Sequence, residues 1–222
     1  LHPLANERPA MFPNDVRDIM CWLSGEELPE GHRFRPIKAY PAGDTVPEVW
    51  MLGSSDYGAQ VAAYFGLPYA FAWFFADGAA GAQAMKVYQS SYKPSERHPE
   101  PNSALCVFAL CADTEEEATY HFQPRARFRL QRDRGIFEAL QSPEAAMAHD
   151  YSEADKLRMR QFQDACFVGT ADSVKAGIEE LAEQLNIQEM AIVTWAHDEP
   201  VRHRSYELLA RAFGLGMQEA AE

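Results

Sequence analysis

The sequence predicts an α/β fold in which a parallel sheet is covered by helices. Short, almost continuous apolar runs alternate along the chain with segments of helical periodicity, and glycines or polar turns separate them. An apolar run without alternation indicates a strand buried on both faces, which is typical of parallel sheets between helices. The 222 residues, 47% hydrophobic and 24% charged, suit a globular chain of this class. We therefore expect residues 1–222 to form a single domain.

The entry segment is expected to hold one helix and an irregular connection. Asn14 is a suitable N-cap, apolar residues recur at helical spacing up to Ser24, and Gly25 is a typical helix end. Residues 26–47 contain repeated prolines and glycines, which exclude a regular helix there.

Four strand and helix pairs follow. The strands are expected at residues 49–52, 68–75, 103–111 and 190–195. The turn Ala76-Asp77-Gly78 follows the second strand, and acidic residues at 113–116 mark a helix start after the third. Gly66 is expected to end its helix in the left-handed conformation, and Asn186 is expected to stop the helix before the last strand. Four parallel strands cannot close a barrel alone, and residues 123–166 are a long polar segment that fits an insertion.

The charge balance argues against nucleic acid as a partner. There are 20 Lys and Arg against 33 Asp and Glu, a formal net charge of −13, which repels a polyanion. The densest basic stretch, Arg125 to Arg134, is interpreted as the solvated side of a helix.

No membrane segment, secretory signal or metal motif is apparent. The longest apolar run, residues 67–76, contains Pro68 and is about half the length that a membrane helix needs. A cytoplasmic location is therefore expected. The seven histidines and four cysteines form no metal-ligand spacing, and free thiols are favoured over disulfides.

The turn after the first strand is a candidate anion site. Gly53, Ser54 and Ser55 end a strand and open a helix, so backbone N–H groups and two hydroxyls would converge at the positive end of the helix dipole. Tyr57 would add a hydroxyl or simply pack. The alternative is a plain N-cap by Ser55 or Asp56, and the Asp56 carboxylate opposes binding of a dianion.

Two further positions follow strands, where barrel enzymes keep their active sites. Trp73 would either lie against a planar cofactor or pack among its aromatic neighbours. His197 and Asp198 follow the last strand and would act as an acid or base, or form a polar pair on a surface loop.

Residues 49–75, VWMLGSSDYGAQVAAYFGLPYAFAWFF, resemble the fifth and sixth β/α units of the bacterial luciferase-like flavin monooxygenases. The similarity continues through SSYKPS, CADTEEEA and VGTADSVKAGIEELAEQL. It implies a (β/α) TIM-barrel type fold, of which this chain would carry the C-terminal half. The family's catalytic histidine lies in the four N-terminal β/α units, which have no counterpart here, so no catalytic residue is assigned.

The resemblance also implies a function and partners. It places the FMN phosphate against Gly53, Ser54 and Ser55, with Tyr57 adjacent and Trp73 beside the flavin ring. Residues 123–166 match the position of a mobile lid. The expected activity is an FMN-dependent monooxygenase that uses oxygen and reduced flavin from a separate flavin reductase on a small-molecule substrate. The alternatives are a non-catalytic flavin-binding or dimerising module and, by fold analogy only, a phosphosugar-binding barrel enzyme.

A homodimer is expected as well. A sheet of four strands would leave two unpaired edges and an uncovered apolar inner face. That face would include Trp50, Leu52, Phe71, Val107 and Ile192 or their neighbours. A second copy would cover it.

Overall fold

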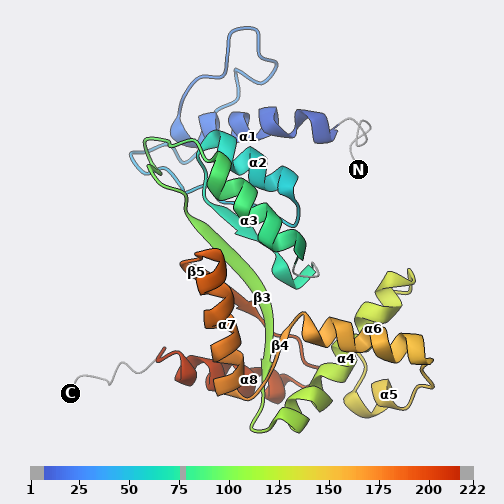
Figure 1. The fold of residues 1–222 in the computed structure, drawn as a ribbon. Coiled ribbons are helices and arrows are strands. Elements are labelled where there is room, and N and C mark those ends of the chain that lie inside the picture. The colour runs from blue at the N-terminus through green and yellow to red at the C-terminus, as the bar shows by residue number, and fades with distance from the viewer. Residues whose placement is uncertain (1–7, 76–78, 216–222) are drawn as a thin grey trace. The chain divides into compact units, whose positions relative to one another are not determined.

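The computed structural model describes residues 8–75 and 79–215 (Figure 1). These residues form two compact units, which divide between Met51 and Leu52. The expected single domain stays a prediction. The turn predicted at Ala76-Asp77-Gly78 lies outside the described residues.

The first unit contains helix α1 (Arg8–Ser24) and an irregular connection. The prediction that this helix starts at Asn14 is wrong, because the helix already includes Arg8 and continues through Pro13. A proline inside a helix removes one N–H donor and its ring crowds the carbonyl four residues earlier, but here the helix is retained around Pro13. The predicted end is confirmed, since Gly25 follows with a φ of 77°. As predicted, residues 26–47 contain neither helix nor strand.

The second unit is built on a parallel sheet, as predicted, with the long strand β3 (Ser103–Cys111) in contact with three others. Strand β2 (Tyr69–Phe71) pairs with the start of β3, and β5 (Glu189–Val193) pairs with residues 104–108. Strand β1 (Met51–Gly53) lies next to β2. A fifth strand, β4 (Phe167–Gly169), pairs with the last three residues of β3. Sequence reasoning missed β4 because three residues are too short to show a periodic pattern.

Helices cover this sheet (Figure 1). Helices α2 (Asp56–Phe65) and α3 (Ala79–Ser91) pack side by side. Helix α4 (Glu115–Asp133) contacts α5 (Pro143–Met147), α6 (Glu153–Asp164) and β4. Helices α7 (Ala171–Leu185) and α8 (Glu199–Ala212) pack against each other, and both contact β3.

The ends of α2 and α7 and the start of α4 lie where the sequence predicts them. Gly66 ends α2 with a φ of 62°, and Asn186 ends α7 with a φ of 52°, both in the left-handed region. Thr114 caps α4 by accepting a hydrogen bond from the Glu117 N–H, and the first turn of α4 is acidic as expected. Local residue chemistry alone specified these boundaries.

Two interpretations of the sequence were wrong. The run at 68–75 is a three-residue strand followed by a 3-10 turn, η1 (Trp73–Phe75), so Trp73 lies just beyond the strand. The basic stretch is not a solvated face, because Arg125, Arg127 and Arg129 are buried on α4. Residues 123–166 therefore begin inside a core helix, and their role as a lid stays a prediction.

The expected uncovered apolar face is also wrong in part. Phe71 and Val107 are fully buried within the single chain, whereas Leu52 is 68% exposed. Helices and neighbouring strands thus already cover most of the central sheet. The homodimer stays a prediction.

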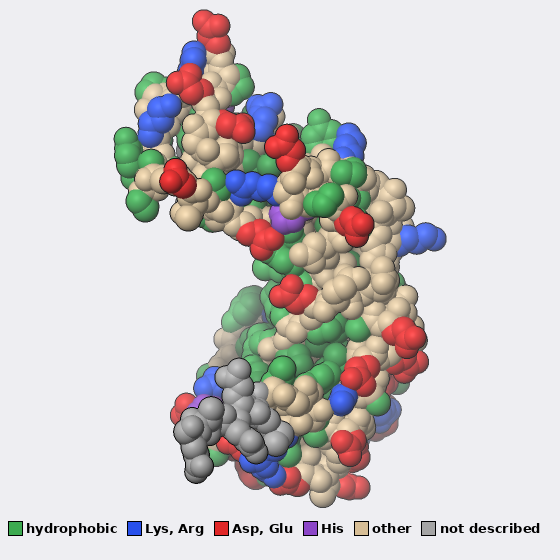
Figure 2. Space-filling view, turned by 90° about the vertical axis from the view of Figure 1, so that its left-hand side faces the viewer, with side chains coloured by type: hydrophobic (Ala, Val, Ile, Leu, Met, Phe, Trp, Pro, Cys, Tyr) green, Lys and Arg blue, Asp and Glu red, His purple; other side chains and the backbone are tan. Residues whose placement is uncertain are grey.

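The described part of the chain was compared with the requirements of a membrane-spanning helix and of a metal-ligand group. None of its helices combines the length and apolarity needed to cross a membrane. It holds no group of three or more His, Cys, Asp or Glu side chains arranged for a metal ion. On the face drawn in Figure 2, Lys and Arg side chains are scattered among Asp and Glu rather than joined in one basic surface.

Candidate functional site

The turn between β1 and α2 presents an open helix N-terminus. Ser55 is the N-cap residue, with extended backbone (φ −151°, ψ 162°), but its side chain makes no capping hydrogen bond. Ser54 and Ser55 are exposed, and neither hydroxyl has a hydrogen-bond partner in the described part of the chain. The first-turn N–H groups of α2 therefore have no side-chain acceptor from Ser55, which leaves them available to an anion.

The buried side chain of Tyr69 contacts this turn. Its ring is fully buried, and its hydroxyl donates a hydrogen bond to the Ser55 carbonyl at 3.1 Å. Burial, and then the charge of Asp56, raise the pKa of Tyr69 to about 12, so it stays a neutral donor. A Cβ added to Gly53 would lie 3.2 Å from the Tyr69 hydroxyl oxygen and 3.4 Å from its ring, so glycine allows the close approach here.

The structure brings Trp73 next to the same turn. The Ala72 N–H donates to the Gly53 carbonyl at 2.8 Å, which ties the residue before Trp73 to the end of β1. Trp73 is 9% exposed and lies edge-on to Phe71, with ring centroids 6.3 Å apart. A Cβ on Gly81 of α3 would come within 2.5 Å of the indole. Trp73 is thus largely packed in the core, and its contact with a cofactor stays a prediction.

Two residues that follow the turn are exposed to solvent. Tyr57, in the first turn of α2, is 45% exposed. Asp56 is also exposed and places a carboxylate at the positive end of the helix. Asp56 favours the isolated helix but weakens anion binding.

His197 and Asp198 form an exposed pair after β5. The Nδ1 atom of His197 lies 2.9 Å from a carboxylate oxygen of Asp198. Close by, the Tyr120 hydroxyl donates to Glu144, a bond that raises the pKa of Tyr120, and Asp198 adds to the effect. Because both side chains of the pair are open to solvent, the geometry fits a polar surface pair better than a catalytic dyad.

Sequence reasoning missed the buried arginines of α4. Arg125 is 1% exposed, and its guanidinium carbon lies 3.8 Å from the Phe108 ring centroid and 4.6 Å from that of Trp195. Arg125 and Arg129 both donate to the carbonyl of Phe74, at 3.3 and 3.2 Å. The i, i+4 spacing of these two arginines, beside the apolar spacing of Phe122 and Ala126, was the available signal.

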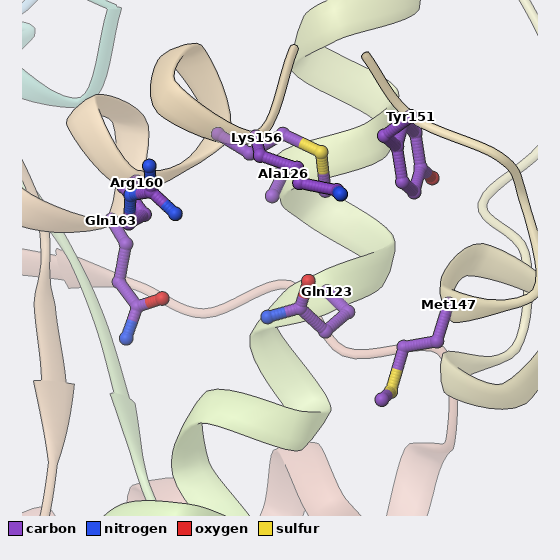
Figure 3. A pocket seen from close by; sticks show the side chains of 8 residues that line it. Gln123, Ala126, Met147, Tyr151, Lys156, Arg160 and Gln163 are labelled. Atoms are coloured by element: carbon purple, nitrogen blue, oxygen red, sulfur yellow. The ribbon is translucent and has the colours of Figure 1, made fainter. Parts of the chain in front are cut away.

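A separate groove of about 240 Å³ lies among α4, α5 and α6 (Figure 3). It combines two cations with thioether, aromatic and amide side chains. The lining residues are Gln123, Ala126, Met147, Tyr151, Lys156, Met159, Arg160 and Gln163. All of them belong to the segment 123–166 and none follows a strand, so this groove is distinct from the turn at 53–55.

Comparison with known proteins supplies the family context. The model of the luciferase-like monooxygenase family matches residues 13–188. The protein YwcH of Bacillus subtilis is 34% identical over 203 residues, which cover 91% of this chain and 60% of that protein. A luciferase-like monooxygenase of Escherichia coli K12 is 32% identical, covering 89% of this chain and 57% of that protein. The crystal structure of apo-MsnO8 matches with a TM-score of 0.79 and 29% identity, over 92% of this chain and 60% of that one. The chain thus spans about three fifths of the length of these proteins.

Proposed function

Because the chain belongs to the luciferase-like monooxygenase family, we propose that it contributes the FMN-phosphate site of an FMN-dependent monooxygenase. The oxidised compound would be a small organic molecule, the co-substrate oxygen, and the source of reduced flavin a separate reductase in the cytoplasm. When bound, FMN supplies the redox chemistry of such an enzyme.

The observation that carries this proposal is the open turn at Gly53, Ser54 and Ser55. Two exposed hydroxyls, without partners among the described residues, stand at an uncapped helix N-terminus directly after a strand of a parallel sheet. A phosphate group fits this chemistry, because it accepts hydrogen bonds from hydroxyls and helix N–H groups and is favoured by the helix dipole. The Asp56 carboxylate opposes it at the same turn.

Each residue then has a defined task. Ser54 and Ser55 would donate hydrogen bonds to the phosphate, and Tyr69 would hold their backbone in place. Trp73 would present an edge or face of its indole to the ring system, which excludes water on that side. The proposed lid within residues 123–166 would cover the bound flavin and exclude water from it.

The test is FMN binding by the chain and by the variant Ser54→Ala/Ser55→Ala, measured by equilibrium dialysis. Two hydrogen bonds to a charged group contribute roughly 1.5–3 kcal/mol each, so affinity should fall at least about 100-fold. The matched control is Ser90→Ala/Ser91→Ala, an adjacent serine pair at the end of α3 whose hydroxyls bond to the Val87 carbonyl.

The outcomes separate the candidate functions. Equal FMN affinity in the parent and in the Ser54/Ser55 variant would refute the phosphate site. FMN binding without reductase-driven oxygen consumption would favour a non-catalytic flavin-binding module. Binding of a phosphosugar in place of FMN would favour the third candidate.

A further inference from the structure

Helix α4 buries three positive charges in a chain of strongly negative net charge. Arg125, Arg127 and Arg129 are 1%, 7% and 8% exposed. Removing a guanidinium from water costs several kcal/mol, so each needs compensating partners. Arg127 has Glu138, with its Nη2 atom 3.3 Å from a carboxylate oxygen. In the described part of the chain Arg125 has no carboxylate partner.

Arg125 and Arg129 converge on one backbone carbonyl. Both donate to the Phe74 oxygen, which belongs to the turn Trp73–Phe75. The Arg125 guanidinium also lies over the rings of Phe108 of β3 and of Trp195, which follows β5. One side chain therefore contacts β3 and the segments that follow β2 and β5.

The peptide unit held by these arginines is held at its other side as well. The Phe75 N–H, in the same peptide plane as the Phe74 carbonyl, donates to the Ala72 carbonyl at 3.1 Å. The Ala72 N–H donates in turn to the Gly53 carbonyl at 2.8 Å. A continuous series of hydrogen bonds thus connects α4 to the turn Trp73–Phe75 and to the end of β1.

We propose that Arg125 and Arg129 are positioning residues that fix the turn Trp73–Phe75 relative to the phosphate-binding turn at Gly53. The inference rests on the proposed function, since Trp73 is the residue proposed to contact the flavin ring. Guanidinium chemistry suits this role at Arg125, because the planar group lies over two rings while its Nη2 donates to the Phe74 carbonyl. A lysine would keep the charge and lose the planar group.

The experiment compares Arg125→Lys and Arg129→Lys with the control Arg127→Lys. The control residue is buried on the same helix but bonds to Glu138 rather than to Phe74. Hydrogen exchange of the Phe75 amide is measured in each full chain without added flavin. Protection should fall about tenfold in the first two variants, which corresponds to about 1.4 kcal/mol, and change less than about twofold in the control.

A second readout addresses the site itself. FMN is titrated into each variant, and the visible circular dichroism of the bound flavin is recorded along with its Kd. Arg125→Lys and Arg129→Lys should change the dichroism and raise the Kd about fivefold or more. Arg127→Lys should change neither, even where it lowers stability equally.

Each result decides a different claim. Unchanged Phe75 protection in both variants would overturn the positioning role. Changed protection with unaltered flavin dichroism and Kd would overturn the link to the flavin. Failure of the parent chain to bind FMN would refute the proposed function, and hydrogen exchange alone would then decide the positioning role.

Discussion

Substitutions at Gly53 and at Tyr69 should be energetically coupled, because the Tyr69 hydroxyl lies close to the position that a side chain at residue 53 would take. A methyl at Gly53 would stand 3.2 Å from the hydroxyl oxygen and 3.4 Å from the ring, while its next neighbour, at 3.7 Å, is in ordinary contact. Gly53→Ala should therefore destabilise the parent by about 1 kcal/mol through overpacking. The roughly 0.4–1 kcal/mol gained from a less flexible unfolded chain offsets part of that cost, and it cancels in the coupling because it is the same with and without Tyr69→Phe.

Tyr69→Phe removes the tight contact and also the hydrogen bond to the Ser55 carbonyl. The single change should cost about 1 kcal/mol, because the carbonyl of the exposed Ser55 is able to bond water instead. When Gly53→Ala is added to the Tyr69→Phe variant, it should be neutral within about 0.5 kcal/mol. The double-mutant cycle should thus yield a coupling of about 1 kcal/mol.

The assay is urea unfolding at equilibrium, followed by far-ultraviolet circular dichroism, for the parent, both single variants and the double variant. Gly43→Ala is the control, because a Cβ there meets nothing within 4 Å. It should have the same small effect with and without Tyr69→Phe. Strictly additive effects of Gly53→Ala and Tyr69→Phe would refute the contact on which the reasoning depends.

Three further changes test the site and its surroundings. Asp56→Asn should tighten FMN binding about twofold to fivefold in dialysis, because it removes an exposed negative charge beside the proposed phosphate site; weaker binding would contradict this. Trp73→Phe should reduce the quenching of protein fluorescence by FMN; quenching as large as in the parent would contradict this. The Glu115 carboxylate accepts hydrogen bonds from the Thr170 N–H and the Ser173 hydroxyl, which lower its pKa below the ordinary 4.5. The stabilisation that these bonds to Glu115 give the fold is therefore present above pH 4.5 and is lost as the pH falls through the folded-state pKa. Acid should thus lower the urea midpoint of the parent more than that of Glu115→Gln.

Much of the fold was predictable because local chemistry specifies it. Nine consecutive small or apolar residues at 103–111 are compatible with a strand buried on both faces, and that strand is β3. Gly66 and Asn186 end their helices where a left-handed residue is needed. The strand β4 could not be predicted, since its three residues are defined by pairing with the far end of β3 and not by any pattern of their own.

The site was predictable only in its local part. The turn at Gly53 to Ser55 follows from a strand, a glycine and a helix start in sequence. The roles of Tyr69 and Arg125 depend on contacts with residues 14 and 51 positions away. A tyrosine in an aromatic run predicts only burial, and an arginine in a basic run predicts only exposure. In the folded chain, tertiary packing buries Arg125 instead.

The burial of α4 limits how the segment 123–166 is able to move. Leu130 of α4 and Met159 and Phe162 of α6 are buried in one apolar cluster with Phe108. Lifting the whole segment would expose these side chains at about 1.5–3 kcal/mol each, and would also break the hydrogen bond from Arg125 to the Phe74 carbonyl. The proposed lid would need a smaller cost than that to open. Its movement would therefore be confined to residues between the end of α4 and the start of α6, where Gly135 has a φ of 75° and Phe137 is 79% exposed.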